Sequence, residues 1–371
     1  MENEKKTLPS VREIVSSLPI RALQLYRPTE ENVDEAIRFV REVVAPAGIT
    51  HITVTLYYGF DYPSHPDIVE RNYPYTTVPV AKKFAAACKE LGIVVVPEID
   101  VPEIDVPGHQ SLIYRDSLPD PKGMIRVYPD MEEPWGEGHS TRSVCTRHPR
   151  LRPILYDMVD DLLEAFDTKV IHTGFDECMD IGKCDRCRGI PEYQLYADLV
   201  NDLNRHVRSR GAEMWIWGDR LLDASQIASP NAGYETSFNN TARAVDLISK
   251  DIVICDWHYN YQPYGYLSIA YLISKGFKVL PAAFNSLAGV EQLAHAANAM
   301  RHTDGMLGTF LTTWSFLDEF MECVNSKIEP YRKSGVIEQN EGDVSSAIHA
   351  SHRFADQSSD VFLKMYVKPE A

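Results

Sequence analysis

The stretch KVIHTGFDE (residues 169–177) joins a short β-prone run to two adjacent carboxylates, Asp176 and Glu177. Gly174 interrupts the apolar run just before these acids. In α/β proteins, functional side chains commonly follow the carboxyl ends of parallel strands. The fold class therefore depends on whether the same pattern recurs on either side of this stretch.

Helical patterns flank this predicted strand on both sides. Before it, Pro153 suits the first turn of a helix, and apolar residues recur at helical spacing as far as Phe166. After it, a second helix is predicted over residues 193–208. The stretch is thus one strand–helix unit of a longer alternation.

Seven further runs have the composition of strands. They are residues 21–26, 51–58, 93–96, 212–218, 251–257, 278–284 and 306–314. Helical patterns over residues 32–44, 80–91, 265–275, 290–300 and 316–325 fill the intervals. Eight strand–helix units without a Pro/Gly/Ser-rich linker predict an α/β fold, a (β/α)8 TIM barrel forming a single catalytic domain. The alternative, a doubly wound sheet, would require a glycine-rich phosphate loop after the first strand, and none is present.

Three regions follow from this interpretation. We expect an N-terminal extension over residues 1–17 and the barrel over residues 18–334. Residues 335–371 are expected to form a C-terminal helical tail that packs on the barrel or on a partner in a homodimer.

Composition and charge exclude several classes of protein. The formal net charge of −16 argues against a nucleic-acid partner, because phosphate contacts need clustered Lys and Arg. The first 15 residues lack the apolar core of a secretory signal, and no window resembles a membrane span. Seven cysteines without such a signal indicate reduced thiols. We therefore expect a cytoplasmic protein that binds no membrane.

Acidic and aromatic residues gather at the predicted strand ends. Asp176 and Glu177 follow the fourth strand, and three other strands end in Trp217, Trp257 and Trp314. Indole faces stack on the apolar surface of a sugar ring, while carboxylates transfer protons. Each tryptophan alone is more commonly a packing residue, and an Asp-Glu pair can cap a helix. Their coincidence at one barrel mouth favours a sugar site.

Two motifs extend this interpretation to a known family. His172–Glu177 (HTGFDE) and Pro102–His109 (PEIDVPGH) resemble segments of family 20 glycoside hydrolases, the β-N-acetylhexosaminidases, and the chain is closest to their hexosaminidase D-like branch. The resemblance covers roughly residues 18–325. It implies an exo-acting enzyme that hydrolyses terminal β-linked GlcNAc or GalNAc of a glycan or glycoconjugate, with substrate-assisted retention and without a cofactor.

The resemblance also implies roles for individual residues. Glu177 would be the general acid and base, Asp176 would orient the 2-acetamido group, and His109 would tune Glu177. Arg21 would bind sugar hydroxyls. The walls of the sugar pocket would be formed by Trp217, Trp257, Tyr259 and Trp314.

The chain also departs from the family pattern. Phe284-Asn285-Ser286 stands where a Tyr-x-Asp is usual, and Phe316 replaces a glutamate after Trp314. The preference between GlcNAc and GalNAc therefore stays open. The alternatives are a barrel glycosidase with a direct carboxylate nucleophile and a sugar-binding barrel without catalysis.

The pentapeptide PEIDV is written twice in succession, at residues 97–101 and 102–106. A strand that continued to the second copy would contain Pro97 in its interior, where proline removes a ladder hydrogen bond. We therefore expect the strand to stop at the first copy. Asp100 is favoured as the active-site aspartate by strand geometry, and Asp105 by its place in the motif.

Three cysteines follow the acid pair closely, namely Cys178, Cys184 and Cys187. The Cys-x2-Cys step resembles part of a zinc site, which Cys145 or a histidine would complete. Reduced cysteines that shape a loop are the favoured interpretation, so no metal is assigned.

Overall fold

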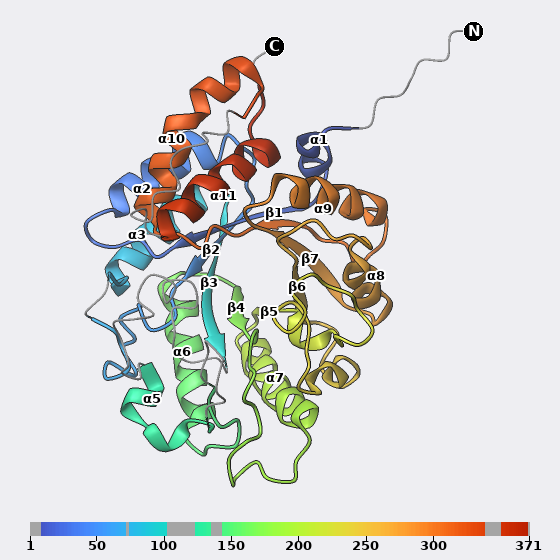
Figure 1. Ribbon diagram of the computed structural model, residues 1–371. Coiled ribbons are helices and arrows are strands. Elements are labelled where there is room, and N and C mark those ends of the chain that lie inside the picture. Colours follow the sequence, from blue (N-terminus) through green and yellow to red (C-terminus); the bar gives the residue numbers. More distant parts are fainter. Residues whose placement is uncertain (1–8, 72–73, 102–122, 135–142, 338–349, 370–371) are drawn as a thin grey trace.

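The computed structural model describes residues 9–71, 74–101, 123–134, 143–337 and 350–369. Eight parallel strands form one closed barrel in the order β1 to β8, with β8 pairing with β1 (Figure 1). The strands are β1 (Ile20–Tyr26), β2 (His51–Thr55), β3 (Val94–Val101), β4 (Val170–Gly174), β5 (Glu213–Trp217), β6 (Val253–Trp257), β7 (Lys278–Ala283) and β8 (Gly308–Leu311). The predicted (β/α)8 barrel is confirmed.

Helices surround this barrel on its outer face (Figure 1). The α-helices are α1 (Val11–Ser16), α2 (Val33–Phe39), α3 (Val78–Glu90), α5 (Gly123–Val127), α6 (Leu151–Ala165), α7 (Glu192–Ser209), α8 (Leu267–Ser274), α9 (Leu287–Met300), α10 (Leu317–Ser334) and α11 (Ala350–Tyr366). A π-helical turn, η1 (Val40–Val44), continues α2, and the 3-10 turns are η2 (Pro129–Met131), η3 (Asp219–Leu221) and η4 (Thr241–Asp246). None of the described helices combines the length and the hydropathy that a bilayer crossing requires.

Side-chain alternation along the strands creates two cores. In β1, Leu23 and Leu25 pack in the outer core between sheet and helices, while Ala22 and Tyr26 point into the barrel. The inner core is mainly aromatic, because bulky side chains from several strands fill the barrel. This alternation decides which strand residues can reach the mouth of the barrel.

Strand β3 is longer than the sequence predicted. It runs through Pro97 to Val101 and so contains the whole first copy of PEIDV. The Val94 amide donates to the Thr50 carbonyl just before β2, and the Glu98 carbonyl accepts from the Leu56 amide just after β2, so the alternate residue Pro97 faces the other neighbour. The register with β4 begins only at Glu98, so proline costs little there. The strand ends at the first copy, as expected, but Pro97 lies inside it.

Helix α11 packs against the barrel and its outer helices. It lies beside α10 and contacts α1, α9 and β8 (Figure 1). The Tyr366 hydroxyl donates a hydrogen bond to the Ala22 carbonyl at 3.2 Å, and Phe354 packs edge-on against Phe284. The C-terminal helix therefore contributes to the core at both ends of the barrel.

We expect Gly308→Ala to destabilise the barrel strongly. A Cβ atom at this position would lie 1.8 Å from the Ile20 carbonyl oxygen and 2.9 Å from the Ile20 Cα, where β8 meets β1. Because both atoms belong to the backbone, a strand must shift, and the free energy of unfolding should fall by about 3 kcal/mol or more. Urea denaturation measures the loss.

Gly211→Ala is the matched control for this substitution. Gly211 has φ +70°, but a Cβ there would meet nothing within 4 Å. The free energy of unfolding of this control should fall by only about 1–2 kcal/mol, the cost of holding an alanine in the left-handed conformation. Equal losses in the two variants would contradict the close approach of β1 and β8.

Candidate functional site

The acid pair lies at the carboxyl end of β4. Gly174 ends the strand at φ +71°, and a Cβ there would lie 2.1 Å from an Asp100 oxygen, so β3 and β4 approach closely. Phe175 and Glu177 also have positive φ, of 72° and 44°. Such conformations cost free energy in residues with a Cβ and concentrate at functional sites. They break the alternation of the strand just where Asp176 and Glu177 follow each other.

The environment raises the pKa of both acids. Burial, and then the nearby charge of Asp219, raises the pKa of Glu177 to about 7, while Arg220 opposes this shift. Burial, Asp219 and Glu177 together raise the pKa of Asp176 well above its ordinary value, and a hydrogen bond with Asp100 opposes it. The neighbouring charge that raises the pKa of Glu177 is that of Asp219 rather than that of the adjacent Asp176. Both carboxyls therefore tend to hold a proton at neutral pH.

Asp219 is a site residue that the sequence analysis missed. It is buried in η3, two residues beyond the end of β5. One of its oxygens accepts hydrogen bonds from the Glu177 amide at 3.1 Å and from Arg220 Nε at 2.6 Å. The other accepts from Trp257 Nε1 at 3.2 Å. Asp219 thus joins β4, β5 and β6, and its place just beyond a strand end was a usable signal.

Four predicted aromatic residues come together at the same end of the barrel. The Trp217 and Trp314 rings lie 6.0 Å apart, and the Trp257 and Tyr259 rings lie 5.0 Å apart. Trp314 Nε1 donates to the Tyr259 hydroxyl at 2.8 Å, which connects the two pairs. Trp217 also stacks on Phe310, at 5.4 Å and nearly parallel. These residues form one aromatic wall; their contact with a sugar stays a prediction.

The prediction for Arg21 is wrong. Arg21 lies at the amino end of β1, opposite the acid pair, and its guanidinium donates to the carbonyls of Leu18 and Gly48, each at 2.5 Å. The arginine at the carboxyl end of β1 is Arg27, which follows Tyr26 and donates to the Leu56 carbonyl at 2.9 Å. Burial lowers the pKa of Arg27. The role in sugar binding was thus assigned to the arginine near the start of β1, while Arg27 is the arginine that follows the strand.

Of the two copies of PEIDV, only the first lies among the described residues. Asp100, in the first copy, lies against Gly174 and hydrogen-bonds with Asp176. Asp105 and the predicted catalytic residue His109 lie outside the described residues. The role of His109 therefore stays a prediction.

A buried polar layer supports the acid pair from inside the barrel. Glu98 accepts hydrogen bonds from Thr55 Oγ1 at 2.6 Å and Gln24 Nε2 at 3.2 Å. Its other oxygen lies 3.6 Å from His172 Nδ1. Burial raises the pKa of Glu98 to about 7 and lowers that of His172 to about 3. His172 is therefore uncharged near neutral pH, and burial favours the protonated form of Glu98, which suits their position beside Trp217.

Comparison with known proteins decides the family. Residues 81–287, more than half of the chain, match the family described as glycosyl hydrolase family 20, catalytic domain. The chain belongs to glycosyl hydrolase family 20. The match includes β3, β4 and the HTGFDE motif with Asp176 and Glu177.

Individual relatives of this family 20 chain are more distant. A β-hexosaminidase of Akkermansia muciniphila is 30% identical over 109 residues, which cover 29% of this chain and 20% of that protein. A β-N-acetylhexosaminidase structure from Bacteroides fragilis has a TM-score of 0.56 at 13% identity, covering 95% of this chain and 67% of the other. A chitobiase structure from Flavobacterium johnsoniae has a TM-score of 0.55 at 15% identity, covering 82% and 46%. At these identities the structural likeness establishes the barrel fold.

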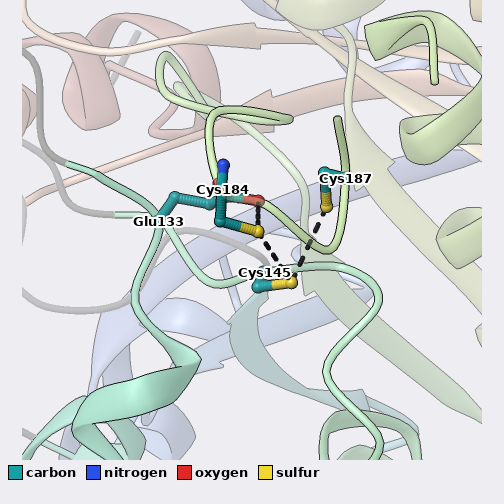
Figure 2. Close-up of side chains that lie close together, drawn as sticks. All are labelled: Glu133, Cys145, Cys184 and Cys187. Atoms are coloured by element: carbon teal, nitrogen blue, oxygen red, sulfur yellow. Dashed lines mark hydrogen bonds between the residues drawn. The ribbon is translucent and has the colours of Figure 1, made fainter. Parts of the chain in front are cut away.

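The cysteine group in the structure does not have the same members as the predicted group. Cys184 and Cys187 lie together, but their neighbours are Cys145 and Glu133, and Cys178 is not part of the group (Figure 2). Cys184 and Cys187 lie on the loop between β4 and α7, beyond the acid pair of this family 20 barrel, whereas Glu133 and Cys145 lie between α5 and α6. Among the described residues, this is the one set of three or more His, Cys, Asp or Glu side chains whose ligand atoms lie close enough to hold a metal ion.

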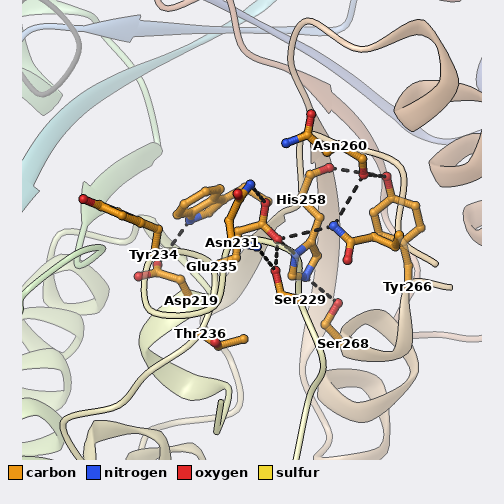
Figure 3. A network of polar contacts seen from close by, with 12 residues as sticks. Asp219, Ser229, Asn231, Tyr234, Glu235, Thr236, His258, Asn260, Tyr266 and Ser268 are labelled. Carbon is orange, nitrogen blue, oxygen red and sulfur yellow. Dashed lines mark hydrogen bonds and ion pairs between the residues drawn. The ribbon is translucent and has the colours of Figure 1, made fainter. Parts of the chain in front are cut away.

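A buried ionic network fixes the loop that carries Tyr259. His258 Nδ1 lies 2.8 Å from Glu235, and its Nε2 lies 2.8 Å from the Ser268 hydroxyl, which donates to Asp256 at 2.7 Å (Figure 3). Burial alone would lower the pKa of His258, but Asp256 and Glu235 raise it to about 10. The histidine therefore stays charged and holds the segment after β5 to the segment after β6.

Proposed function

We propose that this family 20 chain is an exo-acting β-N-acetylhexosaminidase that removes terminal β-linked GlcNAc or GalNAc with retention of configuration. The observation that carries the proposal is the adjacency of Asp176 and Glu177 at the end of β4, with the pKa of Glu177 raised to about 7. A carboxylic acid that keeps its proton near neutral pH suits protonation of a leaving group. The aromatic wall of Trp217, Trp257 and Trp314 supports a sugar as the substrate.

In the proposed mechanism the substrate supplies its own nucleophile. The 2-acetamido carbonyl oxygen attacks the anomeric carbon while Glu177 donates its proton to the departing glycosidic oxygen. The bond from the anomeric carbon to that oxygen breaks, and an oxazolinium ion forms. Glu177, now a carboxylate, then accepts a proton from the water that opens this intermediate.

Asp176 orients the acetamido group in this proposal. Its carboxylate accepts a hydrogen bond from the acetamido N–H and stabilises the positive charge that develops on the oxazolinium ring. Burial and two neighbouring carboxyls favour the neutral form in the free protein. A developing cation beside it favours the ionised form instead, so the interaction strengthens as the reaction proceeds. Cytoplasmic location and homodimer formation stay predictions.

One set of assays tests the proposed activity. Release of nitrophenol is measured from the β-GlcNAc, β-GalNAc and β-glucoside derivatives, with and without a thiazoline that mimics the oxazoline intermediate. We expect activity on the N-acetyl sugars alone and inhibition by the thiazoline. Equal activity on the plain glucoside would instead indicate a direct carboxylate nucleophile, and saturable binding without turnover would indicate a sugar-binding protein.

Asp219→Asn is expected to shift the pH profile of this activity. Glu177 must be protonated to act as an acid, so kcat/KM should be retained below pH 7 and decline as the pH rises through about 7. The Asp219 charge is one cause of the raised pKa, and asparagine removes it. The declining limb of the kcat/KM profile should therefore move to lower pH.

Asp223→Asn provides the control for this shift. Asp223 lies on the same loop but bonds to Ser225 and Gln226, away from Glu177. Its profile should match that of the parent protein. An unchanged limb in a folded Asp219→Asn variant would reject Glu177 as the group that titrates. Asp219→Asn removes the charged partner of the buried Arg220, which destabilises the protein. Far-UV circular dichroism therefore checks that this variant is folded.

A further inference from the structure

Four potential ligand atoms converge on the loop between β4 and α7. Each of Glu133, Cys145, Cys184 and Cys187 offers one atom, and these atoms all lie within 4.8 Å of one another (Figure 2). Cys145 Sγ lies 3.3 Å from Cys184 Sγ and 3.7 Å from Cys187 Sγ. A disulfide bond is about 2.05 Å long, so these sulfurs are separate thiols.

The distances suit tetrahedral coordination. With Zn–S bonds of about 2.3 Å and Zn–O bonds of about 2.1 Å, neighbouring sulfurs lie about 3.8 Å apart, and sulfur and oxygen about 3.6 Å apart. The two observed sulfur separations, 3.3 and 3.7 Å, lie just below this value, and Cys184 Sγ lies 3.4 Å from Glu133 Oε1. Three thiolates with one carboxylate form a donor set that favours zinc over the harder Mg²⁺ and Ca²⁺.

The backbone holds these side chains in place before any ion binds. Cys184 and Cys187 form a tight turn, in which the Cys187 amide donates to the Cys184 carbonyl at 3.1 Å. Glu133 and Cys145 lie on two short segments joined by an antiparallel bridge, with the Cys145 amide donating to the Met131 carbonyl at 2.7 Å. The Cys184 amide also donates to Glu133, at 2.5 Å. The four ligands thus come from three segments that are already hydrogen-bonded together.

Burial makes the group costly without a cation. Glu133, Cys145 and Cys187 are buried, and Cys184 is half-buried. Arg186 lies between Cys184 and Cys187 in sequence and donates to the Asp130 carbonyl at 2.7 Å, on the segment that leads to Glu133. A buried carboxylate beside three thiols is stabilised best by a positive ion that binds all four.

We propose that Glu133, Cys145, Cys184 and Cys187 bind one structural Zn²⁺ ion. Four protein ligands leave no open position, which is typical of structural rather than catalytic zinc. The ion would clamp the β4–α7 loop to the segment between α5 and α6. Because that loop begins at the acid pair, the clamp would restrict the backbone beyond Glu177. The inference does not depend on the proposed sugar chemistry.

Metal content tests this proposal directly. The full chain is produced with added zinc, freed of unbound metal by gel filtration, and its zinc measured by plasma mass spectrometry. We expect about one zinc ion per chain in the parent protein and in the control Cys88→Ser, which removes a buried thiol of α3 outside the group. Cys184→Ser and Cys187→Ser should lose most of the metal. A strong chelator should lower the Tm of the parent by about 5 °C and leave the Tm of a metal-free variant unchanged.

Cobalt provides a second readout in case a cysteine variant fails to fold. Co²⁺ in place of zinc should give the thiolate charge-transfer and d–d absorption bands of a tetrahedral site. Glu133→Gln keeps all three thiolates, so it should retain these bands in altered form and bind zinc at least tenfold more weakly.

Four results would overturn the proposal. The first is a zinc-free parent protein without cobalt bands, and the second is full zinc content in Cys184→Ser and Cys187→Ser. The third is a Cys145–Cys184 disulfide found by mass spectrometry of the non-reduced protein. Unaltered zinc affinity and an unaltered cobalt spectrum in Glu133→Gln would remove the carboxylate from the ligand set and so overturn the four-ligand site.

Discussion

Glu177→Gln is expected to lower kcat on N-acetyl glycosides by about 10³- to 10⁴-fold, because the amide has no acidic proton for the departing oxygen. Because the pKa of Glu177 is raised to about 7, a substantial fraction of this side chain keeps its proton near neutral pH. Since a nitrophenolate leaves with little assistance and an alkoxide does not, the loss should be larger for an alkyl glycoside than for a nitrophenyl glycoside. Steady-state kcat with both substrates measures this difference.

Glu164→Gln is the matched control for the Glu177 substitution. Glu164 is exposed on α6, and the same chemical change there should leave kcat unaltered. Both variants should unfold at the same urea concentration as the parent protein, within error. Near-parental kcat in a folded Glu177→Gln variant, or equal losses for the two leaving groups, would reject Glu177 as the general acid.

The strand–helix alternation was predictable because it depends on local composition. All eight strands appear where the apolar runs predict them, with ends that shift by a few residues. The largest difference is β3, which extends through Pro97 because the missing donor faces β4 before that pairing begins. Whether a proline is tolerated in a strand depends on which neighbour it faces. That is a property of the register, which the sequence alone does not specify.

The candidate site was predictable where its residues share one motif or end a predicted strand, as Trp217, Trp257 and Trp314 do. Asp176 and Glu177 were found because a single motif contains both. Asp219 was missed because it approaches Glu177 only after β5 has packed beside β4. Arg21 was misassigned because it lies at the amino end of the first strand, whereas side chains at the mouth of the barrel follow the carboxyl ends.

The cysteine group was predicted in part: Cys184, Cys187 and the candidate Cys145 belong to it, whereas Cys178 does not and Glu133 was not foreseen. Cys184 and Cys187 are adjacent in sequence, but Cys145 and Glu133 join them only through tertiary packing. Cys178, although near in sequence, is not part of the group, and its buried thiol lies near Tyr196 and Arg220. Residues of one turn, such as Cys184 and Cys187, can therefore be grouped from the sequence. A residue on a separate segment, such as Glu133, joins the group only through the fold.

Asp176→Asn is expected to lower kcat on N-acetyl glycosides by about 10²- to 10³-fold, with a smaller change in KM. The amide can still contact the acetamido group, but it cannot supply the negative charge that stabilises the oxazolinium ion. The thiazoline should therefore bind the variant more weakly by a similar factor, because its affinity depends on likeness to that ion. Asp246→Asn, an exposed carboxylate paired with Lys275, is the control and should leave kcat and inhibition unaltered. Loss of kcat with full thiazoline affinity would contradict the proposed role, since Asp176 would then act on something other than the charge of the intermediate.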